Sequence, residues 1–153
     1  MNSTDAQKIL REQIEKIPVN SANATAFYHH LFSTAPDLRK FFKGAENQSV
    51  DDIHKSERFQ KQGTRLLTSI HVSVELMHND EVLKHYVNEI GVMKHRQFKI
   101  PFDTMKLFFT VFQGYVEKMT GGPLSDQQKA AWDVLDKQWM GHYKAKIDEM
   151  GLP

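Results

Sequence analysis

The sequence contains no cysteine, which excludes disulfide bonds, thiolate metal sites and cysteine nucleophiles. It also lacks an excess of charge of either sign, because the net charge is +1 with the histidines neutral. Proteins that bind nucleic acid through its phosphates concentrate positive charge on one surface. No basic stripe of that kind stands out here, so we expect no nucleic-acid partner.

Long apolar runs are absent as well. No stretch approaches the roughly 20 apolar residues that span a bilayer, so we expect no membrane partner. Residues 1–11 mix polar and charged side chains without an apolar centre, and no signal peptide is visible. With the lack of cysteine, these features predict a cytoplasmic protein. The length favours a single domain over residues 1–153.

Proline and glycine are sparse, and between them apolar residues recur at intervals of three and four, the period of an α-helix. Strand signals are nearly absent, because the chain shows little strict alternation and has no Asn-Gly hairpin. We therefore predict an all-α fold of six to eight helices. Their unequal lengths argue against a four-helix bundle.

Residues that favour helix ends mark the expected boundaries. Short polar side chains satisfy free backbone N–H groups in the first turn of a helix, and proline fits that turn because it has no N–H. Ser125 and Gln128 have the spacing of a capping box for a last helix. The other expected boundaries are stops before Pro18 and at Pro36, and starts at Asn20 or Ser21, Ser56, Asp80 and Pro101, with the Asp80 helix running to about His95.

No common catalytic motif occurs in the chain. It has no glycine-rich phosphate loop, no nucleophile elbow and no His-Glu-x-x-His zinc pair. What stands out are eight histidines and ten phenylalanines. Many aromatic side chains and one imidazole ligand could enclose a flat apolar cofactor, although a phenylalanine-rich helix face is more commonly plain core.

Separated segments in a fixed order narrow this choice. They are 27–32 (FYHHLF), 37–46 (DLRKFFKGAE), 59–63 (FQKQG), Lys94-His95, 99–101 (KIP) and 126–132 (DQQKAAW). In order and spacing they resemble the globin family, over nearly the whole chain from the second helix onward. The chain is similar in particular to nematode globins of the myoglobin type.

The resemblance implies a globin fold that encloses haem b (iron protoporphyrin IX). His95 matches the proximal histidine that ligates the iron, and neutral imidazole is the ordinary iron ligand of oxygen carriers. Without the resemblance, His95 would be interpreted as a surface residue at a helix C-terminus. The other residues implied to contact the haem are Phe42, stacked on it, Leu66 in the distal pocket, and Ile100, Met105 and Phe108 from the proximal side and the edge.

On the distal side, the resemblance places Gln62 where many globins have a histidine and Tyr28 on the second helix. Gln60 is the competing glutamine, but it lies about 200° away around the helix. A carboxamide is a poor ligand for haem iron, so the sixth coordination position would stay open, unlike that of a cytochrome-type electron carrier. The alternative for Tyr28 is a core tyrosine bonded to a backbone carbonyl.

Two features depart from the family pattern. The spacing between His95 and Ile100 differs by one residue from that of myoglobin, so no role is carried over to Gln97 or Phe98. Gly91, one turn before the histidine, replaces the leucine of myoglobin. Because glycine is a poor helix former, we expect a looser helix there.

The expected function is reversible dioxygen binding for oxygen storage or transport, with other diatomic gases as further ligands, and not catalysis. Hydrogen bonds from Tyr28 and Gln62 predict high affinity through slow release. The alternative is a haem enzyme acting on nitric oxide or peroxide, which would need an external reductase because no flavin or nicotinamide domain is visible. A haem-based gas or redox sensor is a third class. Monomer and homodimer both remain open.

Overall fold

The computed structural model describes residues 1–95 and 100–153. Within these ranges the chain forms helices and connecting turns and no strand, which confirms the all-α prediction. None of these helices has the length and apolar character needed to cross a membrane. In chain order the elements are α1 (Ser3–Ile14), α2 (Ser21–Thr34), the 3-10 helices η1 (Pro36–Phe41) and η2 (Val50–Lys55), α3 (Glu57–Leu76), α4 (Asp80–Tyr86), the π-helix η3 (Val87–Met93), α5 (Phe102–Thr120) and α6 (Asp126–Glu149).

Three helix starts confirm the capping predictions. The Asn20 side chain accepts a hydrogen bond from a backbone N–H in the first turn of α2, and Ser56 does the same for α3. Ser125 and Gln128 form the expected capping box of α6, each side chain bonded to the backbone N–H of the other. These caps are local, since donor and acceptor lie within three residues.

Two other boundaries differ from the prediction. Asn79, rather than Asp80, caps α4, because its side chain accepts from the N–H of Val82. Asp80 is instead the first residue of the helix, where a negative charge favours the helix dipole. Pro101 precedes α5 in extended conformation rather than standing in the first turn.

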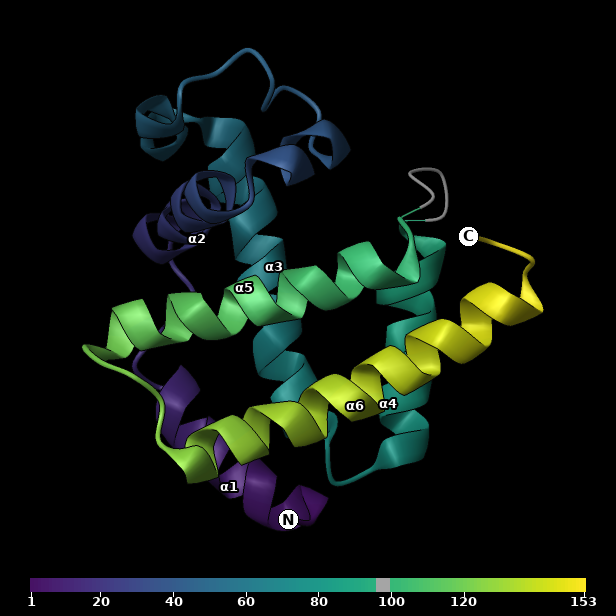
Figure 1. Ribbon diagram of the computed structural model, residues 1–153. Helices are drawn as coiled ribbons and strands as arrows, with labels where there is room; N and C mark the ends of the chain where they lie inside the picture. Colours follow the sequence, from purple (N-terminus) through teal and green to yellow (C-terminus); the bar gives the residue numbers. More distant parts are fainter. Residues whose placement is uncertain (96–99) are drawn as a thin grey trace.

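Figure 1 shows how the helices cross. α5 and α6 run antiparallel across the front, and α3 passes behind them at a steep angle. α1 packs against α6 at the lower edge, and α2 packs against both α3 and α5. α4 lies behind α6 in this view. η3 continues directly from α4 and packs against α6.

Aromatic rings fix α2 against α5. Phe27 is fully buried and has ring contacts to Tyr28 and Phe108 at 5.4 Å, to Phe112 at 5.5 Å and to Tyr115 at 5.3 Å. Three of these four pairs are edge-to-face, the arrangement favoured by aromatic quadrupoles. The packing of Phe27 between α2 and α5 therefore holds the neighbouring Tyr28 in place on α2.

α2 and α3 cross with their backbones in direct contact. A Cβ atom added at Gly63 would lie 2.6 Å from the Cβ of Ala24 and 2.7 Å from its carbonyl oxygen. Only glycine fits at position 63, since any side chain would meet backbone that cannot rotate away. Gln62 precedes this contact on α3 and Tyr28 lies one turn beyond it on α2, so the close crossing brings the two residues together.

Gly63→Ala is expected to lower the free energy of unfolding by about 1–3 kcal/mol, the usual cost of overpacking a core. Gly141→Ala is the matched control, because Gly141 lies exposed within α6 and an added Cβ has nothing within 4 Å. The control should gain roughly 0.5–1 kcal/mol through better helix propensity. Urea unfolding measures both values, and equal gains would contradict the close contact.

Candidate functional site

Tyr28 and Gln62 form a polar pair at the crossing of α2 and α3. Tyr28 is 2% exposed, and the Gln62 side chain lies close enough to its hydroxyl to affect the pKa of the phenol. Burial raises the pKa of the Tyr28 phenol above its ordinary value, and the contact with Gln62 opposes this rise. The phenol therefore stays protonated, and remains a hydrogen-bond donor, throughout the physiological pH range.

The structure distinguishes the two candidate glutamines of α3. The Gln60 side chain donates to the carbonyl oxygen of His54 at 3.3 Å, in an exposed position next to η2. Gln62 instead faces Tyr28. The structure thus brings Gln62, and not Gln60, to the predicted distal pair.

Besides Phe27, three aromatic rings lie next to the Tyr28 phenol. The ring centroids lie 5.1 Å away for Phe59, 5.4 Å for Phe42 and 5.7 Å for Phe32. Phe42 and Leu66 are half-buried against the core, whereas Phe59 is fully buried. The distal pair is therefore walled by apolar side chains, and hydrogen bonds are electrostatically stronger in such surroundings than in water.

His95 lies two residues after the end of the π-helix η3, which Lys94 caps. Its Nδ1 lies 3.0 Å from the carbonyl oxygens of both Ile90 and Gly91. Carbonyl oxygens only accept, so Nδ1 carries the proton, and Nε2 carries the lone pair in the neutral ring. Histidines that ligate metals are commonly oriented in this way, with the second ring nitrogen donating to a carbonyl or carboxylate.

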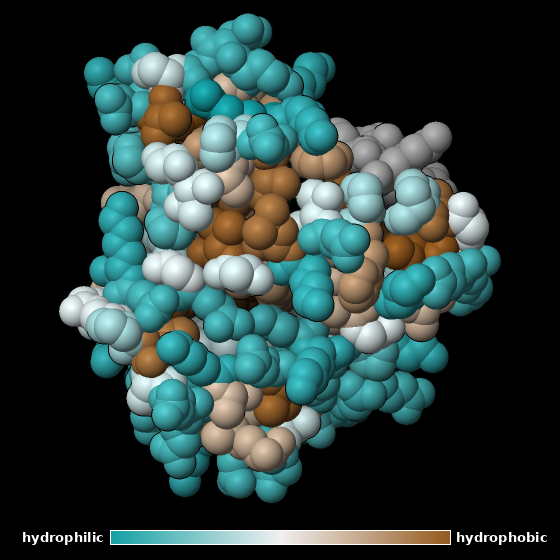
Figure 2. All heavy atoms as spheres, in the orientation of Figure 1, coloured by the Kyte–Doolittle hydropathy of each residue, from teal (hydrophilic) through white to brown (hydrophobic). Residues whose placement is uncertain are grey.

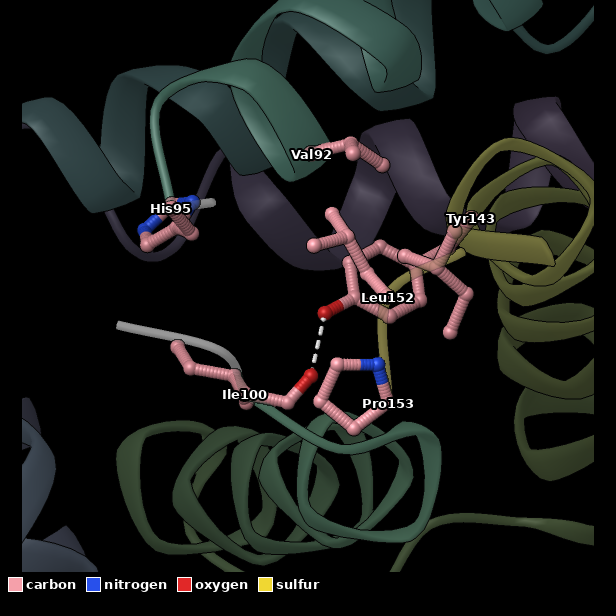
Figure 3. Close-up of a pocket in the computed structure, with 7 residues that line it drawn as sticks. Val92, His95, Ile100, Tyr143, Leu152 and Pro153 are labelled. Carbon is pink, nitrogen blue, oxygen red and sulfur yellow. Dashed lines mark hydrogen bonds between the residues drawn. The ribbon is translucent and has the colours of Figure 1, made fainter. Parts of the chain in front are cut away.

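Ile100 lies beside His95, and both line a small pocket near the C-terminal end (Figure 3). Tyr143 of α6 donates its hydroxyl to the Ile100 carbonyl at 2.7 Å and so ties the start of the α5 segment to α6. Leu152 and Pro153 close the pocket from the other side. Gln97 and Phe98, to which no role was assigned, lie outside the described residues.

Several large apolar side chains near the predicted site are only half-buried. Figure 2 shows apolar side chains gathered in the middle of the face on which α5 lies. Met105 is buried, whereas the half-buried members that pack against the core include Phe41, Phe42, Leu66, Ile100, Phe102 and Phe108. A flat apolar group bound against them would complete their burial, at about 25 cal/mol for each Å² removed from water.

The donor set fits a haem better than a bare metal ion. Among the described residues, no group of three or more histidine or acidic side chains is placed to chelate a metal. A haem supplies four nitrogen ligands of its own and needs from the protein one imidazole and an apolar lining. His95 is the candidate for the first, and the half-buried apolar residues are candidates for the second.

The sequence prediction did not include two residues on the proximal side, Trp139 and Tyr143. Trp139 packs against Gly91, and Tyr143 is stacked on Trp139 with ring centroids 5.7 Å apart. Both residues share one face of α6, because they are four positions apart. The only sequence signal was the replacement of a leucine by Gly91, which makes room for a large partner.

Together these features place the chain among small all-α proteins, with a histidine oriented by backbone carbonyls after η3 and a tyrosine–glutamine pair at the crossing of α2 and α3. The sequence model of the family described as Globin matches residues 25–138. The chain belongs to the globin family, which confirms the predicted resemblance and the predicted fold.

Nematode relatives cover most of the chain. A globin-like protein of Caenorhabditis elegans is 44% identical over 134 residues, or 88% of this chain and 82% of the relative. The cuticular globin isoform of Nippostrongylus brasiliensis is 36% identical over 157 residues, covering 100% and 90%. The myoglobin of the same species is 33% identical over 153 residues, covering 97% of each chain.

Solved structures agree with this assignment. A globin-like protein of C. elegans matches with a TM-score of 0.92 at 39% identity and covers 100% of this chain and 98% of its own. The myoglobin of Aplysia limacina matches with a TM-score of 0.81 at 21% identity, covering 95% and 98%. At that identity the second match shows the shared fold alone.

Proposed function

We propose that this globin binds dioxygen reversibly at a pentacoordinate haem b, for oxygen storage or transport. Bound haem would supply the iron that takes up the gas. The observation that supports the proposal is the contact between the buried Tyr28 side chain and Gln62, two neutral donors next to aromatic side chains. That one relative is named a myoglobin supports the same function.

His95 would hold the iron, because its Nδ1–H is occupied by two backbone carbonyls and Nε2 carries the lone pair. The apolar wall would comprise Phe42, Leu66, Ile100, Met105 and Phe108. A tyrosine ligates haem iron as a phenolate, and the raised pKa of Tyr28 disfavours that form. A carboxamide is a poor ligand as well, so neither distal residue would close the face opposite the histidine.

Tyr28 and Gln62 would act by donating hydrogen bonds to the polarised gas. Each bond contributes about 0.5–1.5 kcal/mol net, and 1.4 kcal/mol corresponds to a factor of ten. Two bonds together would slow oxygen release by roughly tenfold to a hundredfold. The proposed carrier therefore gains its affinity from slow release.

The test is a visible spectrum of protein produced with haem available. We expect a strong Soret band, a five-coordinate spectrum after reduction, and a reversible change on exposure to oxygen. His95→Leu should lose most of the bound haem, whereas His85→Leu, on the exposed side of α4, should not. A missing Soret band, or a six-coordinate reduced form without added ligand, would refute the proposal. Rapid autoxidation with fast rereduction would favour an enzyme instead.

A further inference from the structure

We infer that Trp139 is a positioning residue for the proximal histidine: its indole ring packs against the Gly91 turn of η3 and maintains the carbonyls that orient His95. The inference rests on the proposed function, since it concerns the histidine that would ligate the iron. It assigns a role to a side chain that is far from Gly91 in the sequence.

The contact between Trp139 and Gly91 is unusually close. A Cβ atom added at Gly91 would lie 2.6 Å from Cη2 and 3.0 Å from Cζ2 of the indole. The ring therefore occupies the space that a side chain at position 91 would need. Phe109, with its centroid at 5.0 Å, and Tyr143, at 5.7 Å, hold the indole in place from α5 and α6.

The π-helical turn changes which groups bond to each other. In an α-helix the amide of Lys94 would bond to the carbonyl of Ile90, four residues earlier. Here it bonds to Glu89, five residues earlier, at 3.1 Å, and the His95 amide bonds to Val92 at 3.1 Å. The Ile90 carbonyl is thereby diverted from the backbone ladder and accepts from the His95 ring at 3.0 Å.

The indole stabilises this wide turn by packing. π-Helical turns are rare and occur frequently at functional sites. We expect the wide turn of η3 to need support from a neighbouring side chain. Trp139 is buried, 6% exposed, and its edge fills the volume beside Gly91. A smaller side chain would leave a void, and the turn could then tighten to α-helical bonding. The Ile90 carbonyl would return to the Lys94 amide, and the imidazole would lose one of its two acceptors.

The experiment compares Trp139→Phe, the volume-compensated double variant Gly91→Ala/Trp139→Phe, and Trp132→Phe. Trp132 is the matched control, because it is also buried on α6 but contacts Phe112 and donates to Gln13 rather than packing on η3. Resonance Raman spectroscopy of the reduced holoprotein measures the iron–histidine stretching frequency, which responds to hydrogen bonding at Nδ1. Transfer of haem to an excess of haem-free acceptor measures haem loss.

We expect Trp139→Phe to shift the iron–histidine frequency and to speed haem loss by about ten- to a hundredfold, the usual effect of losing an outer partner of a metal ligand. The double variant should return both values toward the parent, and Trp132→Phe should lose stability with an unshifted frequency. A normal Soret band with an unshifted frequency in Trp139→Phe would overturn this inference alone. If Trp139→Phe does not retain haem, the double variant tests the inference. A frequency equal to that of the parent would support it, because the methyl group added at position 91 would then replace the packing lost with the indole, and a shifted frequency would overturn it. Absence of haem from the parent protein would overturn the proposed function.

Discussion

Replacing Tyr28 with phenylalanine is expected to speed oxygen release by up to about tenfold. The variant removes one of the two proposed donors, each of which contributes about 0.5–1.5 kcal/mol, and 1.4 kcal/mol corresponds to a factor of ten. The phenylalanine ring keeps the contacts to Phe59 and Phe42, so the packing around position 28 should change little. Stopped-flow displacement of oxygen by carbon monoxide measures the rate.

Tyr115→Phe provides the matched control for this prediction. Tyr115 is a buried tyrosine on α5, and its hydroxyl donates to the backbone carbonyl of Asn23 at 2.8 Å. Its loss should cost about 0.5–1.5 kcal/mol of stability and leave oxygen release unchanged. Release of carbon monoxide, which is polarised less than oxygen, should respond less to the loss of the Tyr28 hydroxyl. An unchanged oxygen rate in Tyr28→Phe would remove this residue from the mechanism.

The second large effect is expected at Asp136, a carboxyl group between α5 and α6. Its Oδ2 accepts from the Gln113 side chain at 2.7 Å, while its buried Oδ1 has no hydrogen-bond partner among the described residues. Burial raises the pKa of Asp136 to about 7, Gln113 lowers it, and the like charge of Asp133 adds to the rise. The folded protein therefore holds a proton here that the unfolded chain, with a pKa of about 3.9, has released.

The direction of the pH dependence follows from this proton. The stability contributed by Asp136 is fully present below about pH 4 and is lost as the pH rises through 7. Each pH unit in that window costs about 1.4 kcal/mol, or about 4 kcal/mol in total. Asp136→Asn cannot ionise, so its free energy of unfolding relative to the parent should rise by about 3 kcal/mol from pH 5 to pH 8.

Urea unfolding of the parent and the Asp136→Asn variant at both pH values measures this difference. Asp133→Asn is the control, since Asp133 is exposed on the same helix and should change stability by no more than about 0.5 kcal/mol at either pH. Parallel pH profiles of parent and Asp136→Asn would show that the carboxyl titrates normally in the folded state.

Local features of the fold could be predicted from the sequence because their causes are local. Ser56 and the pair Ser125–Gln128 cap helices through bonds that span three residues. Asn79 and Asp80 show the limit of this reasoning. Both side chains suit a cap, and the choice between them depends on where the preceding helix ends.

The proximal geometry could not be predicted, because its causes are distant in the chain. Gly91 predicted a looser helix at this point, but not a π-turn, which we infer to depend on an indole contributed by α6. The distal pair of Tyr28 and Gln62 was expected from the resemblance alone. The physical reason for their meeting is the backbone contact at Gly63, which only the structure reveals.

The crossing of Gly63 and Ala24 would also limit how a gas molecule reaches the proposed site. α2 and α3 cannot separate at this point without losing a packed backbone contact. A hinge movement between these two helices is therefore not expected to open the site. Access must then depend on the swing of individual side chains at the rim, such as half-buried Gln62 and Leu66. Side-chain rotations of this kind occur in picoseconds to nanoseconds, so entry of the proposed ligand would not wait for slower movements of whole helices.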